Sequence, residues 1–415
     1  MVCTRRRTGG RVGRRHRIAY VSGPIDAAKV FREWRGRQAS DYFGTIYLVH
    51  LYALLDEFSS DGLIITTLPR GRSTERLEHL TIVNLPMPSG RERTGALYHA
   101  AMFAWAVRCM VEVVRYRADA ALLTAGQDYF WVFRPLRLFG IRLLASLHCT
   151  LWPKFAPRKK HHLFLTWLNG RLFYPACDHI QGVSEEAVAQ IVSCAPSIHD
   201  RPRRFIATYD PARFEQVLPA SWPPSGEPFR LLYVGRIEVN KGVLDLAEVM
   251  RRLEEREPSR FKLDICGEGP AEEELKRAVE QAKLASVINV WGQCNTGSLA
   301  KLYAECHAVV VPTRSDFEEG TPKVAFEAVL NLRPVVMSAA CPALADVAAA
   351  TVEPKVDDVE DYVRAIGALS DDPELYAEKV AAAGICRLKH FDERHSYGAV
   401  LRAGLQPLLA APSSQ

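Results

Sequence analysis

Three stretches in the second half of the chain decide its fold: LLYVGRIEVNKG (231–242), DICGEGP (264–270) and VVVPTRSDFEEGTPKVAFEAVLNLRPVV (309–336). In the first, an apolar strand over 231–234 is followed by a helix predicted to open at Gly242, with Arg236 and Lys241 on the loop between them. The N–H groups at a helix start carry partial positive charge, so two cations beside it suit a diphosphate. A turn with solvated basic residues would look the same, and this motif alone leaves both interpretations open.

Two glutamates, Glu319 and Glu327, bracket a helix start in the third stretch. Pro322 is of the residue type favoured at the first helical position, which places Glu319 on the loop and Glu327 two turns inside. Lys323 would then stand four residues before Glu327, so a surface ion pair of about 0.3 kcal/mol is the alternative role. The flanking apolar strands favour a site, because they bring both glutamates to the carboxyl edge of a sheet.

These residues resemble glycosyltransferase family 4, the retaining nucleotide-sugar enzymes of the two-Rossmann fold called GT-B. The resemblance is strongest over 229–352, where strand-GR-x4-KG, GEGP, and EG-x6-EA followed by RPVV occur in the family's order. It implies that Arg236 and Lys241 hold the donor diphosphate. It also implies that Glu319 contacts hydroxyls of the donor sugar and that Glu327 binds the ribose of the nucleotide.

The same resemblance places phosphate-binding backbone amides at Gly320, Thr321 and Lys323. The chain departs from the family here, because many members read EGFGLV where this sequence reads EGTPKV. Pro322 has no N–H group, so the cradle would use one amide fewer. The Lys323 side chain could compensate with its charge, or it could be an ordinary surface residue.

The N-terminal half carries a second series of strands and helices. A polar, basic loop is predicted from Ser22 to Ser40, and a helix over 44–57. Gly44 either marks that helix start or, as in the family's glycine-rich loop, approaches the donor phosphates. His148 follows a strand at the carboxyl edge; the resemblance implies contact with the donor sugar, and the alternative is a histidine capping a buried loop. The predicted strands cover 18–21, 63–67, 120–124 and 141–147.

Residues 157–174, PRKKHHLFLTWLNGRLFY, combine a basic cluster with several large apolar residues. One interpretation is an interfacial segment that positions a lipid-linked acceptor. The other is a core helix with a solvated basic start. Because apolar residues surround this helix rather than forming a stripe, the pattern favours burial.

The predicted fold class is α/β, a GT-B architecture of two Rossmann-like doubly wound domains facing across a cleft. Length supports it, because 415 residues with 48% hydrophobic content suffice for two cores. The predicted organisation is a basic tail at 1–16, an acceptor domain at 17–217, a Pro-rich linker at 218–228, a donor domain at 229–390, and a C-terminal helix at 391–415 that crosses back to the first domain.

The net charge is +5, and residues 1–17 hold seven arginines and no acid, so the rest of the chain carries −2. That balance excludes a nucleic-acid partner for the body. The tail is predicted to be a disordered extension, the alternative being contact with anionic lipid. With no apolar run near the length of a membrane span, we expect a cytoplasmic protein, with any membrane contact peripheral and on the inner face. No cysteine or histidine cluster has zinc-ligand spacing.

The sequence therefore predicts a retaining transfer of a hexose-type sugar from a UDP- or GDP-sugar to a glycan or lipid-linked acceptor, in polysaccharide or glycolipid biosynthesis. Arg236 and Lys241 would stabilise the leaving diphosphate without a metal or other cofactor. Two alternatives are a sugar-nucleotide epimerase of the same fold and a catalytically silent nucleotide-sugar-binding protein. A dinucleotide dehydrogenase is disfavoured, because neither first strand leads into G-x-G-x-x-G.

Overall fold

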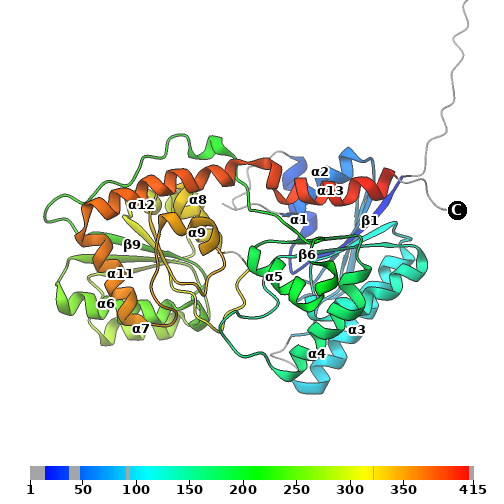
Figure 1. Ribbon diagram of the computed structural model, residues 1–415, viewed down its shortest axis with the longest axis horizontal. Helices are drawn as coiled ribbons and strands as arrows, with labels where there is room; N and C mark the ends of the chain where they lie inside the picture. Colours follow the sequence, from blue (N-terminus) through cyan, green and yellow to red (C-terminus); the bar gives the residue numbers. More distant parts are fainter. Residues whose placement is uncertain (1–14, 37–46, 90–93, 321, 411–415) are drawn as a thin grey trace, which may run out of the picture.

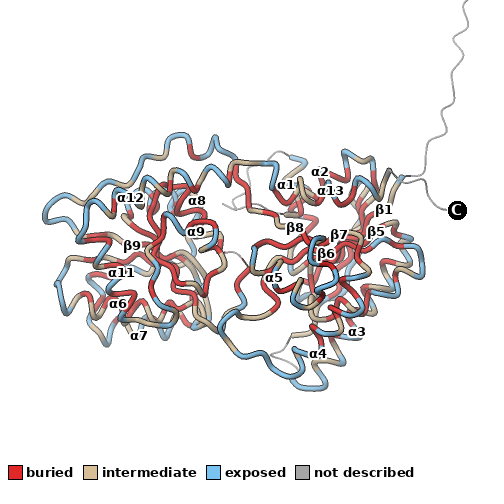
Figure 2. The backbone as a smooth tube through the Cα atoms, in the orientation of Figure 1, coloured by how far each residue is buried: buried red, intermediate tan, exposed pale blue. Residues whose placement is uncertain are grey.

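The computed structural model describes residues 15–36, 47–89, 94–320 and 322–410. It has two α/β domains side by side, each built on its own sheet (Figure 1). Buried residues follow the strands within each domain, so each has its own core (Figure 2). The predicted class, two Rossmann-like domains, is confirmed.

The N-terminal sheet has eight strands in the order β3-β4-β2-β1-β5-β6-β7-β8, and only β3 and β4 pair antiparallel. Along β1, Ile18 and Tyr20 join one buried cluster while Ala19 and Val21 join another, because successive side chains of a strand point to opposite faces. Helices cover both faces, which explains the continuous apolar sequence of the central strands. The strands are β1 Arg17–Val21, β2 Asp61–Thr66, β3 Ser73–Leu77, β4 Leu80–Asn84, β5 Ala120–Leu123, β6 Arg142–Leu147, β7 His179–Gly182 and β8 Arg203–Arg204.

The prediction of a polar loop after the first strand is wrong for the middle of that segment, which forms the helix α1. Asp26 caps this helix by accepting from the Lys29 amide at 3.0 Å. Val30 and Phe31 are buried on its inner face, whereas Arg35 pairs with Asp56. Its arginines conceal the short apolar stripe in the sequence. The helices of this domain are α1 Ala27–Arg35, α2 Tyr47–Glu57, α3 Gly95–Arg115, α4 Lys160–Leu168 and α5 Glu185–Cys194, with the helical segments η1 Gln127–Phe139 and η2 Asn169–Phe173.

The C-terminal sheet has six parallel strands in the order β11-β10-β9-β12-β13-β14, the Rossmann order. The direction of winding reverses between β9 and β12, so a crevice for ligand is expected at their carboxyl ends. The strands are β9 Phe229–Val234, β10 Phe261–Cys266, β11 Ile288–Gly292, β12 Ala308–Val311, β13 Val335–Met337 and β14 Thr351–Val352. The main helices are α6 Val243–Arg256, α7 Glu272–Gln281, α8 Thr296–Glu305, α9 Lys323–Leu330, α11 Val359–Asp371 and α12 Pro373–Cys386.

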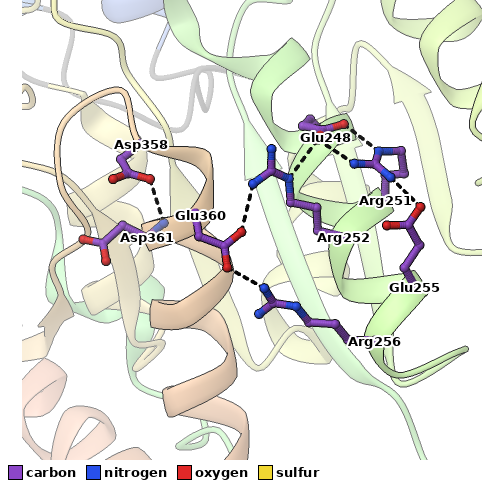
Figure 3. Close-up of polar contacts among 8 residues, drawn as sticks. All are labelled: Glu248, Arg251, Arg252, Glu255, Arg256, Asp358, Glu360 and Asp361. Atoms are coloured by element: carbon purple, nitrogen blue, oxygen red, sulfur yellow. Dashed lines mark hydrogen bonds and ion pairs between the residues drawn. The ribbon is translucent and has the colours of Figure 1, made fainter.

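Helices α6 and α11 are joined by an ion-pair network on the surface of this domain (Figure 3). Arg252 donates to Glu360 of α11 at 2.8 Å and to Glu248 of its own helix at 2.8 Å. Arg256 is the second partner of Glu360. These groups are exposed to solvent, so each pair contributes little to the stability of the domain and is weakened by salt.

The chain returns to the first domain at its end. Residues 218–228 contain no helix or strand, and α13, at Tyr397–Ala410, packs on α2. Tyr397, Leu401 and Leu405 are fully buried in the same cluster as Leu51. Figure 1 shows α13 crossing over the N-terminal domain. The two domains are therefore connected twice.

The structure bears on two expectations: that no apolar run approaches the length of a membrane span, and that residues 157–174 are buried. By length and composition alone, the 21-residue α3 is able to cross a membrane, although a single such helix is weak evidence and core helices meet the same test. Trp105 and Cys109 of α3 are in the core of the domain. For residues 157–174 the pattern favoured burial, which holds for Leu165 and Phe173, yet Phe164 and Trp167 are each 58% exposed.

Candidate functional site

A cleft of about 660 Å³ lies at the carboxyl ends of β9, β10 and β11 and beside the start of α9. Its lining includes Arg236, Lys241, Glu319, Lys323 and Glu327. The reversal of winding between β9 and β12 thus brings together side chains from three separate motifs, as the topology requires.

Lys241 and Glu319 form an ion pair inside this cleft, with 15% and 10% of their side chains exposed. The Lys241 ammonium group also lies 4.2 Å from the centre of the Phe317 ring. Gly242 follows at φ 72°, where an added Cβ would lie 1.9 Å from the carbonyl oxygen of Pro312. Only glycine fits there, and this close approach fixes the turn that carries Lys241 into the cleft.

Arg236 is the more exposed cation, with 62% of its side chain accessible. Its guanidinium group donates to Glu238 at 2.8 Å, and it lies 5.9 Å from the Phe317 ring. Arg236 and Lys241 therefore each have a carboxylate beside them. An incoming anion would compete with these carboxylates for the two cations.

Glu327 is 7% exposed and accepts a hydrogen bond from the Tyr303 hydroxyl at 3.0 Å. Burial raises the pKa of Glu327, and the Tyr303 bond opposes this shift. Tyr303, on α8, is a site residue that the sequence analysis missed. The helix α9 begins at Lys323 with Pro322 as its cap, one residue later than predicted.

The two domains meet at the Glu319–Gly320 turn. The Thr150 hydroxyl donates to the Glu319 carbonyl oxygen at 3.2 Å. A Cβ on Gly320 would lie 2.0 Å from the carbonyl oxygen of His148 and 3.0 Å from Cα of Cys149. The glycine predicted to cradle phosphate is therefore also where the backbones of the two domains come into contact.

His148 lies at this junction, packed among Tyr47, Phe205 and Tyr397 with ring centroids 4.5–5.6 Å away. Burial, with a smaller contribution from the nearby Lys323 charge, lowers the pKa of His148 to about 3. The imidazole is therefore neutral at physiological pH. Its Nε2 is 3.2 Å from the Ser146 hydroxyl.

Of the remaining predicted residues, the structure describes Lys323 but not Gly44 or Thr321. The Lys323 ammonium lies 5.9 Å from the ring of Tyr47 in the other domain, so this side chain reaches across the junction. In the part of the chain that the structure describes, no group of three or more His, Cys, Asp or Glu side chains could hold a metal ion.

A second cluster borders the junction and was missed. His162 at the start of α4 lies 3.3 Å from the Asp128 carboxylate, which raises the pKa of His162. Burial raises the pKa of Glu318, next to Glu319, and the negative charge of Asp128 adds to that rise. No motif links these residues. Asp128 and His162 meet within the N-terminal domain, and the packing of the domains brings Glu318 to them.

Two Rossmann-like domains, with a cleft at the carboxyl edge of the second sheet, are the architecture of the GT-B class of fold. Residues 215–384 match the family described as Glycosyl transferases group 1. Residues 215–384 are therefore a group 1 glycosyltransferase domain, within a chain whose two-domain fold is of the GT-B type. No curated protein matches it.

Solved structures agree in fold. Sucrose-phosphate synthase from Thermosynechococcus elongatus has a TM-score of 0.67 at 17% identity, over 96% of this chain and 100% of that one. The E. coli trehalose-6-phosphate protein bound with UDP-2-fluoro glucose has a TM-score of 0.68 at 13% identity, over 95% and 99%. Anabaena HepE, solved in complex with UDP, has a TM-score of 0.64 at 13% identity, over 95% of this chain and 100% of that one. At such identities the likeness concerns the fold alone.

Proposed function

We propose that this glycosyltransferase moves a hexose-type sugar from a UDP- or GDP-sugar to a glycan or lipid-linked acceptor with retention of configuration. The observation that carries the donor assignment is the Lys241–Glu319 pair, a cation and a carboxylate held together in one cleft with Arg236 and Glu327. Binding of UDP by HepE and of a UDP-sugar analogue by the E. coli protein supports a nucleotide donor here.

In this proposal each residue acts on a different part of the donor. Arg236 and Lys241 hold the diphosphate, and Glu327 holds the ribose through its buried carboxylate. Glu319 exchanges its bond to Lys241 for bonds to sugar hydroxyls. The backbone amides of Gly320 and Lys323 complete the phosphate cradle.

Cleavage of the sugar–phosphate bond leaves positive charge at the anomeric carbon and negative charge on the diphosphate. Two fixed cations at the leaving group lower the barrier, and loss of one such group commonly costs about 10²–10³ in rate. The departing phosphate would accept the proton of the acceptor hydroxyl, which attacks the same face. Neutral His148 contributes a hydrogen bond to the donor sugar rather than a charge. We propose no metal in this step, and transfer should persist in EDTA.

The test is nucleoside-diphosphate release from a panel of UDP-, GDP- and ADP-sugars, with and without a lipid or cell-envelope extract. Release that requires the extract and is lost in Arg236→Ala/Lys241→Ala would support the proposal and identify the donor. Isomerisation of the sugar without an acceptor would instead indicate an epimerase. Nucleotide binding without turnover under every condition would favour a silent binding protein.

A further inference from the structure

The surface of α4 and the following η2 segment exposes large apolar side chains. Phe164 and Trp167 are each 58% exposed and stack on one another, with ring centroids 6.0 Å apart and planes 21° apart. Leu163 is 43% exposed, Leu172 is 41% exposed, and Phe155, on the loop before α4, is 47% exposed. We call these five residues the apolar patch. Figure 1 places α4 at the lower edge of the N-terminal domain, away from its sheet.

The rest of the helix holds this orientation firmly. Leu165, Thr166, Asn169 and Phe173 are buried. The Asn169 side chain accepts from the Trp131 amide at 2.8 Å and donates to the Gln127 carbonyl at 2.7 Å. The inward face is therefore fixed by packing and hydrogen bonds, and the outward face of the same helix is the apolar one.

The surroundings of the apolar patch are strongly basic. Between Asp128 and Asp178 the sequence contains eight Arg or Lys residues and no Asp or Glu. Three of the eight pair with carboxylates outside this stretch: Arg137 and Arg142 with Asp178, and Lys154 with Glu186. Lys159, Lys160 and Arg171 are exposed beside the apolar patch, on α4, η2 and the loop before them. An exposed apolar helix face with a cationic border fits a surface that offers both hydrocarbon and negative charge.

We propose that the apolar patch and its basic border dock this protein on an anionic lipid bilayer. Phe164 and Trp167 would enter the headgroup region, while the lysines remain at the level of the phosphates. A second copy of the chain fits less well, because two such surfaces would oppose like charges. A bilayer satisfies both halves of the surface.

The docking surface borders the junction of the two domains. His162, in the first turn of α4, contacts Asp128, and both their charges and that of Lys159 act on Glu318. A bilayer in contact with α4 would therefore place lipid headgroups next to the cleft. This proximity favours a lipid-linked acceptor. That statement about the acceptor rests on the proposed function, whereas the lipid docking does not.

The test is sedimentation with sucrose-loaded vesicles of phosphatidylcholine alone or mixed with phosphatidylglycerol, without any nucleotide sugar. The wild-type protein should bind the anionic vesicles and be released by salt. Phe164→Ser/Trp167→Ser should bind about a hundredfold more weakly, since burial of each aromatic side chain is worth about tenfold. The matched control is Ile385→Ser/Leu388→Ser on the other domain, whose residues are 70% and 60% exposed. It should bind as the wild type does.

Equal binding by the Phe164/Trp167 variant and the wild type would overturn the proposal, as would no preference for anionic vesicles. Sedimentation equilibrium in the absence of lipid supplies a further outcome: a dimer that the same variant abolishes would show that a second copy covers the apolar patch, and would also overturn it. Thermal unfolding checks that the variant folds. A protein that fails the vesicle test yet transfers sugar keeps the proposed function, so the two proposals can fail separately.

Discussion

Substitution of Glu319 by glutamine should strengthen the binding of free nucleoside diphosphate while it slows transfer. The Glu319 carboxylate forms an ion pair with Lys241, the cation that we assign to the diphosphate. Binding of the nucleotide therefore has to proceed beside a like charge. Glutamine keeps the size of the side chain and removes that charge.

The size of the effect follows from the geometry of one ammonium group. Two oxygens that accept from it at about 2.8 Å lie about 5 Å apart. A carboxylate and a phosphate charge at this distance repel by about 3 kcal/mol at an effective dielectric constant of about 20. Water and salt in the open cleft weaken the repulsion, and we take about 1.4 kcal/mol, a tenfold lower dissociation constant. Transfer should fall about 10²–10³-fold, because the sugar loses a charged partner.

Titration calorimetry with UDP and GDP measures the first effect, and nucleoside-diphosphate release from the active donor measures the second. The control is Glu305→Gln, which removes the same charge at the end of α8, where its partner is Lys301 at 3.8 Å. It should change neither quantity. Unchanged or weaker nucleotide binding by Glu319→Gln would refute the competition between carboxylate and diphosphate for Lys241.

Three further results are expected. Gly320→Ala forces the domain backbones apart and should lower the rate of transfer about 100-fold, whereas Gly367→Ala, whose Cβ would have 4.0 Å to its nearest neighbour, should not; equal rates would show that the junction is dispensable. Tyr303→Phe removes the hydroxyl that orients Glu327 and should weaken nucleotide binding about fivefold in calorimetry; unaltered binding would contradict that role. Because burial lowers the pKa of His148 to about 3, below about pH 6.5 the unfolded chain binds a proton that the folded protein does not. As the pH is lowered from about 6.5 towards 3, the free energy of unfolding should therefore decrease by up to about 1.4 kcal/mol per pH unit because of this residue. Urea unfolding at several pH values should show a weaker pH dependence of that free energy for His148→Gln.

The strands and the donor motifs were predictable because their signals are local. β12 is an unbroken apolar run and β9 is apolar except for Arg230, as expected of strands buried on both faces. Each leads into a loop with charged residues, so the parallel topology alone placed Lys241 and Glu319 at one edge. By contrast, α1 carries two arginines and a lysine in nine residues, which hid its short buried stripe.

The junction between the domains could not be predicted in the same way. That Gly320 touches the backbone of His148 depends on how two separately folded domains come together. The same holds for the approach of Glu318 to Asp128 and His162 of the other domain, since no motif connects them. Hydrophobic periodicity describes how an element faces its own sheet and carries no information on a contact between domains.

The error over residues 157–174 has a different origin, and it bears on function. A helix that is apolar all round predicts burial on every side, because water is a poor environment for each face. The fold buries Leu165 and Phe173 but leaves Phe164 and Trp167 in solvent. The apolar residues on both faces of this helix indicate that both faces should be shielded from water, and the N-terminal domain shields only the inner one. The vesicle test therefore asks whether lipid covers the other face, where the exposed Lys159, Lys160 and Arg171 favour an anionic bilayer.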